Sequence, residues 1–360
     1  MSPMNALNDI ALPISWPDKT AYGDEKWMFF LKRIGIVKNL HFKVGHAAIL
    51  LIERSSGSIR YYDFGRYLSP RGYGRARSAL FDPRLTISTK ARVSNQGDIQ
   101  NIREILEELS AKEEATHGGG RTFFSTCKQV SFSKCVAYAE RIVAGGPISY
   151  GAFAKDNNSC SRFVAQILTE GMAPDDRKRR KILYPECLKA SPMSNVVNAA
   201  TNDYIYCYDE GKLHSLRMKR KDSILFQFDL VKDNFTKKGA KSLTSDQTPG
   251  MIDAPPRPNT VPVNAQWLGG IGEGAWFHLE ALGEDSAFIM YKYTASGDLE
   301  YQIQTTCVQQ FQPDRPYRFT YHFMYRSYSI LQEDNLYIFS STPETEVIDN
   351  NSLRLEKTIL

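Results

Sequence analysis

The chain has 360 residues, which is long enough for two domains. Its hydrophobic fraction of 42% and charged fraction of 24% are those of an ordinary globular protein and argue against a chain that is disordered throughout. The net charge of +5 is small for this length. Basic residues are scattered apart from one run at 177–181, which we interpret as a solvated face rather than a nucleic-acid site.

Six cysteines form no CxxC pair and no Cys/His metal pattern, so we expect no metal, no cofactor and a reducing compartment. The N-terminal residues lack a basic start followed by an apolar core, and no apolar run is long enough to span a bilayer. The default expectation is therefore a cytoplasmic protein without a transmembrane segment. Export by a route that leaves no such signal stays open.

The first elements along the chain predict a helix followed by a β-hairpin. A short amphipathic helix is expected over Trp27–Ile36. The continuous apolar run at 44–52 is typical of a central strand buried on both faces. A turn at Arg54–Gly57 then leads into a second strand, Ile59–Phe64, which is rich in aromatic residues.

Further elements of the first half are predicted from caps and stop signals. Residues 69–78 are expected to form a loop rich in glycine and arginine, and Asp98 is expected to cap a helix that begins directly after it. Three more helices are expected at Ser133–Ala144, from Cys160 to Gly171, and over 192–200.

The sequence texture changes near Tyr204, where short aromatic and β-branched runs begin to alternate with turns. We therefore expect an α+β domain over 1–203 and a β-rich domain, a sandwich or barrel, over 204–360. Glycines 270, 272 and 274 lack the spacing of a dinucleotide-binding loop and predict close backbone packing instead. The expected strands are 204–208, 224–230, 276–281, 287–293, 317–325 and 335–339.

Cys160 is the first candidate for chemistry. Asn158 and Ser159 precede it and are typical N-cap residues, which places the thiol in the first turn of a helix. Unsatisfied N–H groups and the helix dipole favour a thiolate there, and the Cys160 N–H could face an oxyanion. The competing interpretation is an inert core cysteine, because Cys160 shares a helical face with Phe163 and Ile167.

His46 and Asp63 are tied together by the hairpin. A histidine inside a buried strand needs hydrogen-bond partners. If the loop is the four residues 54–57, Ala48 pairs with Asp63, and Asp63 lies diagonal to His46 on the same face of the sheet. A loop that is one residue longer or shorter would put Tyr62 there instead, so either residue is a candidate partner of His46.

A buried-strand histidine, an acidic residue on the next strand and a cysteine at a helix start are the parts of Cys–His catalysis. Their order, together with Gly45-His46-Ala47-Ala48 and Ser159-Cys160-x-x-Phe163-Val164, resembles the circularly permuted branch of the NlpC/P60 papain-like superfamily. That branch includes lecithin:retinol-acyltransferase-like proteins. The resemblance implies a permuted papain-like domain, and Tyr150 ahead of the cysteine also fits its pattern.

The chain is also similar to a family of Bacteroidetes-type bacterial proteins without an assigned substrate. The shared stretches are Gly-His-Ala-Ala, Asp-Phe-Gly-Arg-Tyr at 63–67, Thr-His-Gly at 116–118 and Tyr-x-Ala-Phe at 150–153. Retinol-acyltransferase-like members carry a second histidine where this chain has Asp63. That departure weakens any transfer of their acyltransferase chemistry to this chain.

The function expected from these residues is a thiol hydrolase that cleaves an amide bond in a peptide or a peptidoglycan-type stem. Cys160 attacks, His46 is the base, Asp63 orients His46, and the Tyr150 hydroxyl assists at the oxyanion. Two alternatives stay open: an acyltransferase or esterase/lipase with the same site and a lipid-acyl substrate, or a non-catalytic binding protein on a papain-like scaffold.

Overall fold

A computed structural model describes residues 7–24, 26–151, 156–187, 189–243, 251–283 and 286–341. The described residues form two compact units. Unit 1 holds the residues up to 243 apart from 66–75 and 145–147, and unit 2 holds those two segments and the residues from 251 onward. The fold class is α+β followed by a β-rich part, as expected. The division between the units lies beyond 243, however, and not at 203/204.

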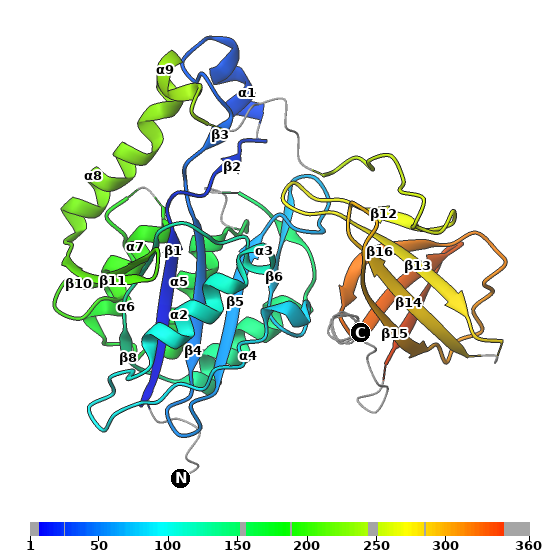
Figure 1. Cartoon of the computed structure of the whole chain (residues 1–360), viewed down its shortest axis with the longest axis horizontal. Coiled ribbons are helices and arrows are strands. Elements are labelled where there is room, and N and C mark those ends of the chain that lie inside the picture. The colour runs from blue at the N-terminus through cyan, green and yellow to red at the C-terminus, as the bar shows by residue number, and fades with distance from the viewer. Residues whose placement is uncertain are drawn as a thin grey trace, which may run out of the picture. The chain divides into compact units, whose positions relative to one another are not determined.

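Unit 1 is built on a mixed arrangement of helices around one large sheet (Figure 1). Its strand order is β11-β10-β7-β1-β4-β5-β6-β9, and β8 also pairs with β1. In chain order the elements are β1 (Asp9–Trp16), β2 (Ala21–Tyr22), α1 (Lys26–Arg33), β3 (His41–Phe42), β4 (His46–Ile52), β5 (Ile59–Gly65), β6 (Tyr73–Arg77), the 3₁₀ helix η2 (Pro83–Leu85), α2 (Ile102–Ala111), α3 (Glu113–Thr116), β7 (Thr122–Phe124), β8 (Cys127–Val130), α4 (Phe132–Ala144), β9 (Ile148–Ser149), α5 (Cys160–Gly171), α6 (Arg177–Leu183), α7 (Pro192–Ala199), β10 (Tyr204–Asp209), β11 (Lys212–Arg217), α8 (Arg220–Val231), η3 (Lys232–Phe235) and α9 (Lys237–Ala240).

The β4–β5 hairpin has the predicted register. Ala48 lies opposite Asp63, and the Glu53 N–H donates to the Ser58 carbonyl at 2.9 Å, which closes the turn after a loop of four residues. Every residue of β4 is buried because helices cover both faces of the sheet at this point. The continuous apolar run was therefore a correct indication of a central strand.

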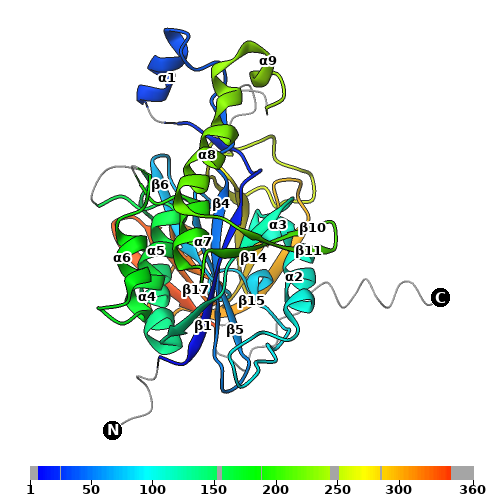
Figure 2. The ribbon, with the colours of Figure 1, turned by 90° about the vertical axis from the view of Figure 1, so that its left-hand side faces the viewer.

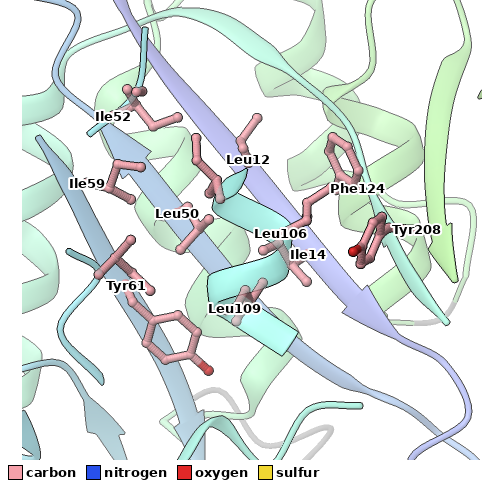
Figure 3. Packing of buried hydrophobic residues seen from close by; sticks show 14 of the residues in the cluster. Leu12, Ile14, Leu50, Ile52, Ile59, Tyr61, Leu106, Leu109, Phe124 and Tyr208 are labelled. Atoms are coloured by element: carbon pink, nitrogen blue, oxygen red, sulfur yellow. The ribbon is translucent and has the colours of Figure 1, made fainter. Parts of the chain in front are cut away.

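One face of the sheet packs against α2. Alternate residues of β1 and β4 point to this side, and Leu106 and Leu109 of α2 fill the space above them (Figure 3). The opposite face is covered by α4 and α5, where the Phe64 ring lies 6.0 Å from that of Phe163. The sheet between these layers fixes the positions of the residues at the ends of β4 and β5.

Three expected elements of the chain differ from the structure. Asp98 does not cap a helix: α2 begins at Ile102, and Asp98 pairs with Lys128 at 2.7 Å. The expected loop at 69–78 contains strand β6, which extends the sheet. Residues 224–230 lie within helix α8 and not in a strand, because the Lys219 N–H is capped by the Asp222 carboxylate at 2.9 Å.

The boundary near 204 is wrong because β10 joins the first sheet. Tyr206 and Cys207 pair with Phe124 and Phe123 of β7, and β11 continues the sheet beyond β10. Ile205 is fully buried in a cluster formed with residues of α7 and β7. The aromatic residues of this segment therefore belong to the second strand from the edge of the unit 1 sheet and not to a new domain.

Unit 2 is a sheet in the order β12-β13-β14-β15-β18-β17-β16, in which consecutive strands on this path are antiparallel. The two end strands, β12 and β16, also lie close to each other. The Gln266 side chain donates to the Tyr317 carbonyl at 2.8 Å and accepts from the Phe319 N–H at 2.9 Å. The bounds are β12 (Gln266–Leu268), β13 (Ala275–Ala281), β14 (Ala287–Tyr293), β15 (Leu299–Thr306), β16 (Arg318–Met324), β17 (Ser327–Gln332) and β18 (Asn335–Ser340).

The glycines before β13 are explained by close packing, as predicted. The Gly272 N–H donates to the Arg66 carbonyl at 2.8 Å, and a Cβ at Gly270 would lie 2.8 Å from the Arg66 oxygen and the Leu68 nitrogen. A side chain at either position would therefore displace the 66–68 segment. These glycines allow the close backbone packing that the sequence predicted.

Candidate active site

Cys160 is the first residue of α5. The Ser159 side chain accepts a hydrogen bond from the Arg162 N–H at 3.4 Å and is the N-cap, as the sequence predicted. The residue as a whole is half-buried. Its thiol lies 3.7 Å from the Ser161 hydroxyl and within hydrogen-bonding reach of the Ala47 N–H. Its position at the positive end of the helix dipole favours the thiolate.

His46 begins strand β4 and lies beside Cys160. Its Nε2 is 3.2 Å from the Asp63 Oδ2, and the same imidazole forms a side-chain hydrogen bond with the Cys160 thiol. Because Nε2 faces the carboxylate, Nδ1 is the ring nitrogen left for the sulfur. The Trp16 ring stacks on the imidazole at a centroid distance of 5.7 Å and an interplanar angle of 8°, which fixes the plane of the ring.

Asp63 lies on β5 and is completely buried. Its carboxylate receives two hydrogen bonds from Arg77, Nε to Oδ1 at 2.9 Å and Nη2 to Oδ2 at 2.5 Å, and a third from the Tyr61 hydroxyl at 2.9 Å. The structure thus brings Asp63, not Tyr62, to His46. The Tyr62 hydroxyl points to the other face of the sheet and donates to Glu140 at 2.7 Å.

The electrostatics of the three residues are mutually consistent. Burial opposes the charged form of His46, but its hydrogen bonds to Asp63 and Cys160 outweigh burial and raise the pKa of His46 to about 9. Burial likewise favours a neutral Asp63. The Arg77 charge and the hydrogen bonds from His46 and Arg77 nevertheless hold the pKa of this carboxyl well below its usual value.

The pKa of the Cys160 thiol is lowered, in spite of burial, by the hydrogen bond and positive charge of His46 and by contacts with Ser161 and Ala47. All six cysteines lie in the described ranges, and the pKa of each of the other five is raised by burial, to about 11 for Cys127 and about 12 for Cys135. Cys160 is therefore the cysteine best suited to act as a nucleophile.

Tyr150 lies in the segment just before α5. Its ring stacks on Phe64 at 6.3 Å, and its backbone bridges to Asn158, which sets the approach of the chain to Cys160. Its assignment to the oxyanion stays a prediction. The Ala152-Phe153 part of the same motif lies outside the described residues.

Sequence reasoning missed the residues that support the site. Arg77 is completely buried and also donates to the Ala115 carbonyl at 3.0 Å, but it falls in a segment that was expected to be a loop. Trp16 ends β1, and the alternation of apolar residues at 10, 12, 14 and 16 was an available signal for that strand. Gly118 packs against the Trp16 ring, where a Cβ would come within 2.5 Å, so the Thr-His-Gly stretch has a packing role.

In the described part of the chain, no group of three or more His, Cys, Asp and Glu side chains is arranged to hold a metal ion. No helix in the described ranges is long and apolar enough to cross a membrane. The site places in series a thiol with a lowered pKa, an imidazole with a raised pKa and a buried carboxylate. This arrangement suits nucleophilic attack on a carbonyl carbon followed by proton donation to the leaving group.

Comparison with known proteins gives two family matches. Residues 11–176 match the family of type VI secretion system effectors that are TseH-like, and residues 265–342 match the DUF6695 C-terminal domain. The crystal structure of the type VI secretion system effector TseH aligns with a TM-score of 0.39 and 19% sequence identity, over 58% of this chain and 97% of that one. A search of curated proteins finds no significant match. The segment that holds His46, Asp63 and Cys160 is therefore similar to TseH-like type VI secretion system effectors.

Proposed function

We propose that unit 1 is a thiol hydrolase of the permuted papain-like, NlpC/P60 type, and that it cleaves an amide bond in a peptide or a peptidoglycan-type stem. The observation that carries the proposal is the series Cys160, His46 and Asp63, in which the imidazole contacts both the thiol and the carboxylate. Three residues from two strands and a helix start converge, and Cys160 keeps partial exposure for a substrate.

In the proposed reaction the Cys160 sulfur attacks the carbonyl carbon, and the electron pair of the C=O bond moves to oxygen. Collapse of this intermediate breaks the C–N bond, and the His46 imidazolium gives its proton to the departing amine. A thioester on Cys160 remains. The now neutral His46 then takes a proton from water, whose oxygen attacks the thioester, releases the acid and regenerates the thiolate.

Asp63 serves this cycle by stabilising the imidazolium and holding its orientation. The Arg77 and Tyr61 hydrogen bonds hold the carboxylate in place, and the charge of Arg77 lowers the pKa of Asp63 and so keeps it ionised. We assign the Cys160 backbone N–H, at the unsatisfied start of α5, to the oxyanion, with the Tyr150 hydroxyl as its partner. Arg77 and Tyr61 are positioning residues, because they act through Asp63.

The match of residues 11–176 to TseH-like effectors supports delivery of this chain by a type VI secretion system. A wall peptide or another peptide amide in a recipient bacterium is the substrate class that fits both delivery and a thiol hydrolase. The proposal for the substrate rests on the site chemistry and on this match together.

The test is digestion of purified peptidoglycan sacculi and of a panel of stem peptides by the full chain, followed by mass spectrometry of the products. We expect cleaved amides with new amine and acid ends, and their loss in Cys160→Ala. Cys187→Ala is the matched control, because Cys187 is also partly exposed but has a raised pKa. Products that persist in Cys160→Ala would overturn the proposal. If the acyl group is transferred to an added lipid or amine and no hydrolysis is seen, the activity is that of an acyltransferase and not of a hydrolase.

A further inference from the structure

A lobe of unit 1, which we call the α1–α9 lobe, consists of residues 21–44 and 225–241, described apart from residue 25. Figures 1 and 2 both show α1 and α9 together beyond one end of the large sheet. The lobe is held together by a buried asparagine. The Asn234 side-chain amide donates to the carbonyls of Asn39 and His41, each at 2.8 Å, and Asn39 in turn donates to the Ala240 carbonyl at 3.1 Å. The two segments therefore form one ordered body.

The surface of this lobe is unusually apolar. Of the 20 large hydrophobic side chains exposed in the described part of the chain, nine belong to it. Trp27 and Phe30 lie one turn apart on α1, with 50% and 60% of their surface exposed, and Phe228 of α8 is 67% exposed. The others are Phe29, Ile34, Ile36, Val44, Leu225 and Phe235. Clustering on this scale marks an interaction surface rather than the scattered exposed hydrophobics of ordinary proteins.

The same lobe is the basic part of the chain. Its two segments contain nine Lys and Arg residues and four Asp and Glu residues, so their net charge of +5 equals that of the whole chain. The rest of the chain is therefore neutral in sum. Arg33, Lys237 and Lys238 of this lobe are exposed, as are the apolar side chains named above.

From this combination we infer that the α1–α9 lobe docks on the surface of an anionic lipid bilayer. Tryptophan and phenylalanine rings favour the headgroup boundary of a membrane, and Lys and Arg beside them are attracted to anionic headgroups. Long basic side chains can also lie along the apolar surface while their charges reach the headgroups. The lobe projects beyond one end of the large sheet of unit 1, as Figures 1 and 2 show.

This inference is independent of the proposed hydrolase. The lobe contains none of the residues of the Cys160 site, and docking requires no chemistry at the thiol. A lipid surface accounts for both the apolar and the basic character of the lobe. An apolar protein partner would account for the exposed rings but leaves the concentration of positive charge unexplained.

The test is co-sedimentation of the full chain, carrying Cys160→Ala, with vesicles of phosphatidylcholine alone and of equal parts phosphatidylcholine and phosphatidylglycerol. We expect binding to the anionic vesicles, weakening as salt is added. The double variants Trp27→Ser/Phe30→Ser and Arg33→Glu/Lys238→Glu should each weaken it by about tenfold or more. Two matched controls should bind like the parent. Val308→Ser changes an exposed apolar side chain in unit 2, and Lys90→Glu/Lys212→Glu changes two exposed lysines of unit 1 outside the lobe.

Thermal melting of each variant separates lost binding from lost folding, and light scattering reports self-association. Wild-type binding by both folded lobe variants would overturn the inference, and so would equal affinity for neutral and anionic vesicles. The inference would also be overturned if the chain bound no vesicles. If it then self-associated, and Trp27→Ser/Phe30→Ser abolished that self-association, the lobe would be assigned to a protein partner. Failure of these tests leaves the sacculus assay unaffected, because the two use different residues.

Discussion

The carboxylate of Asp63 lies 3.2 Å from the Nε2 of His46 across the β4–β5 hairpin, and neither residue is adjacent to the other in the ladder. Strand alternation puts both on one face, and the buried sheet around them keeps bulk water away. The negative charge of Asp63 therefore acts on His46 with little screening, and His46 passes the effect to Cys160.

Asp63→Asn should leave Cys160 in place but lower its reactivity toward iodoacetamide near neutral pH by roughly tenfold, because the imidazolium loses its counter-charge. Alkylation rates followed by mass spectrometry measure this, and a melting curve checks that the variant is folded. Glu104→Gln is the control, since Glu104 is also paired with an arginine but is exposed. An unchanged rate in folded Asp63→Asn would remove Asp63 from the site.

Arg77→Ala should destabilise the protein by about 3–5 kcal/mol, because it leaves the Asp63 carboxylate buried without its guanidinium partner. In the folded fraction the pKa of Asp63 should rise, and the alkylation of Cys160 should slow. Denaturant unfolding and labelling measure the two effects.

Arg75→Ala is a matched control for Arg77→Ala. Arg75 is also almost fully buried, but its guanidinium contacts the Tyr321 carbonyl and the Phe323 ring of unit 2. Its loss should lower stability without changing the reactivity of Cys160. If both variants slow the alkylation of Cys160 equally in their folded fractions, Arg77→Ala acts through a general loss of packing. Positioning of Asp63 by Arg77 would then be excluded.

Sequence patterns predicted the register of the β4–β5 hairpin and the cap of α5 correctly. A turn of four residues fixed which residue of β5 lies opposite Ala48, and the cap at Ser159 fixed the place of Cys160, because both depend on neighbours within a few positions. Arg77 and Trp16 come close to Asp63 and His46 only because strands from distant segments pair. No local sequence pattern predicts such contacts. Segment 204–217 was misassigned for the same reason, since aromatic alternation predicts a strand but not the sheet that it joins.

Turnover should depend on pH through His46. The imidazolium is the proposed acid for the leaving amine, and the pKa of His46 is about 9. Hydrolysis should therefore fall as pH rises through about 9, because the proton to be donated is lost, whereas alkylation of Cys160 should not fall there, because the thiolate persists. Parallel pH profiles of the two reactions make the comparison. A loss of alkylation in step with turnover would contradict this assignment of the acid.

Truncation should locate the edge of unit 1. A chain ending at residue 243 should fold and keep a reactive Cys160, although segment 66–75 loses its unit 2 contacts. A chain ending at 201 should be markedly less stable, because it exposes Phe123 and Val196, which pack with Ile205. Melting curves and Cys160 labelling of both chains check this. Equal stability of the two would show that β10 and β11 are dispensable for unit 1.

The central claim is that His46 holds Cys160 as a thiolate. Its most direct test is brief iodoacetamide treatment of the folded full chain at about pH 6, where an ordinary cysteine with a pKa near 8.5 is almost wholly protonated. Peptide mass spectrometry then reads the label on each of the six cysteines. The account predicts label on Cys160 well above that on every other cysteine, and its loss in His46→Gln. Preferential labelling of another cysteine, or undiminished labelling of Cys160 in His46→Gln, would contradict it.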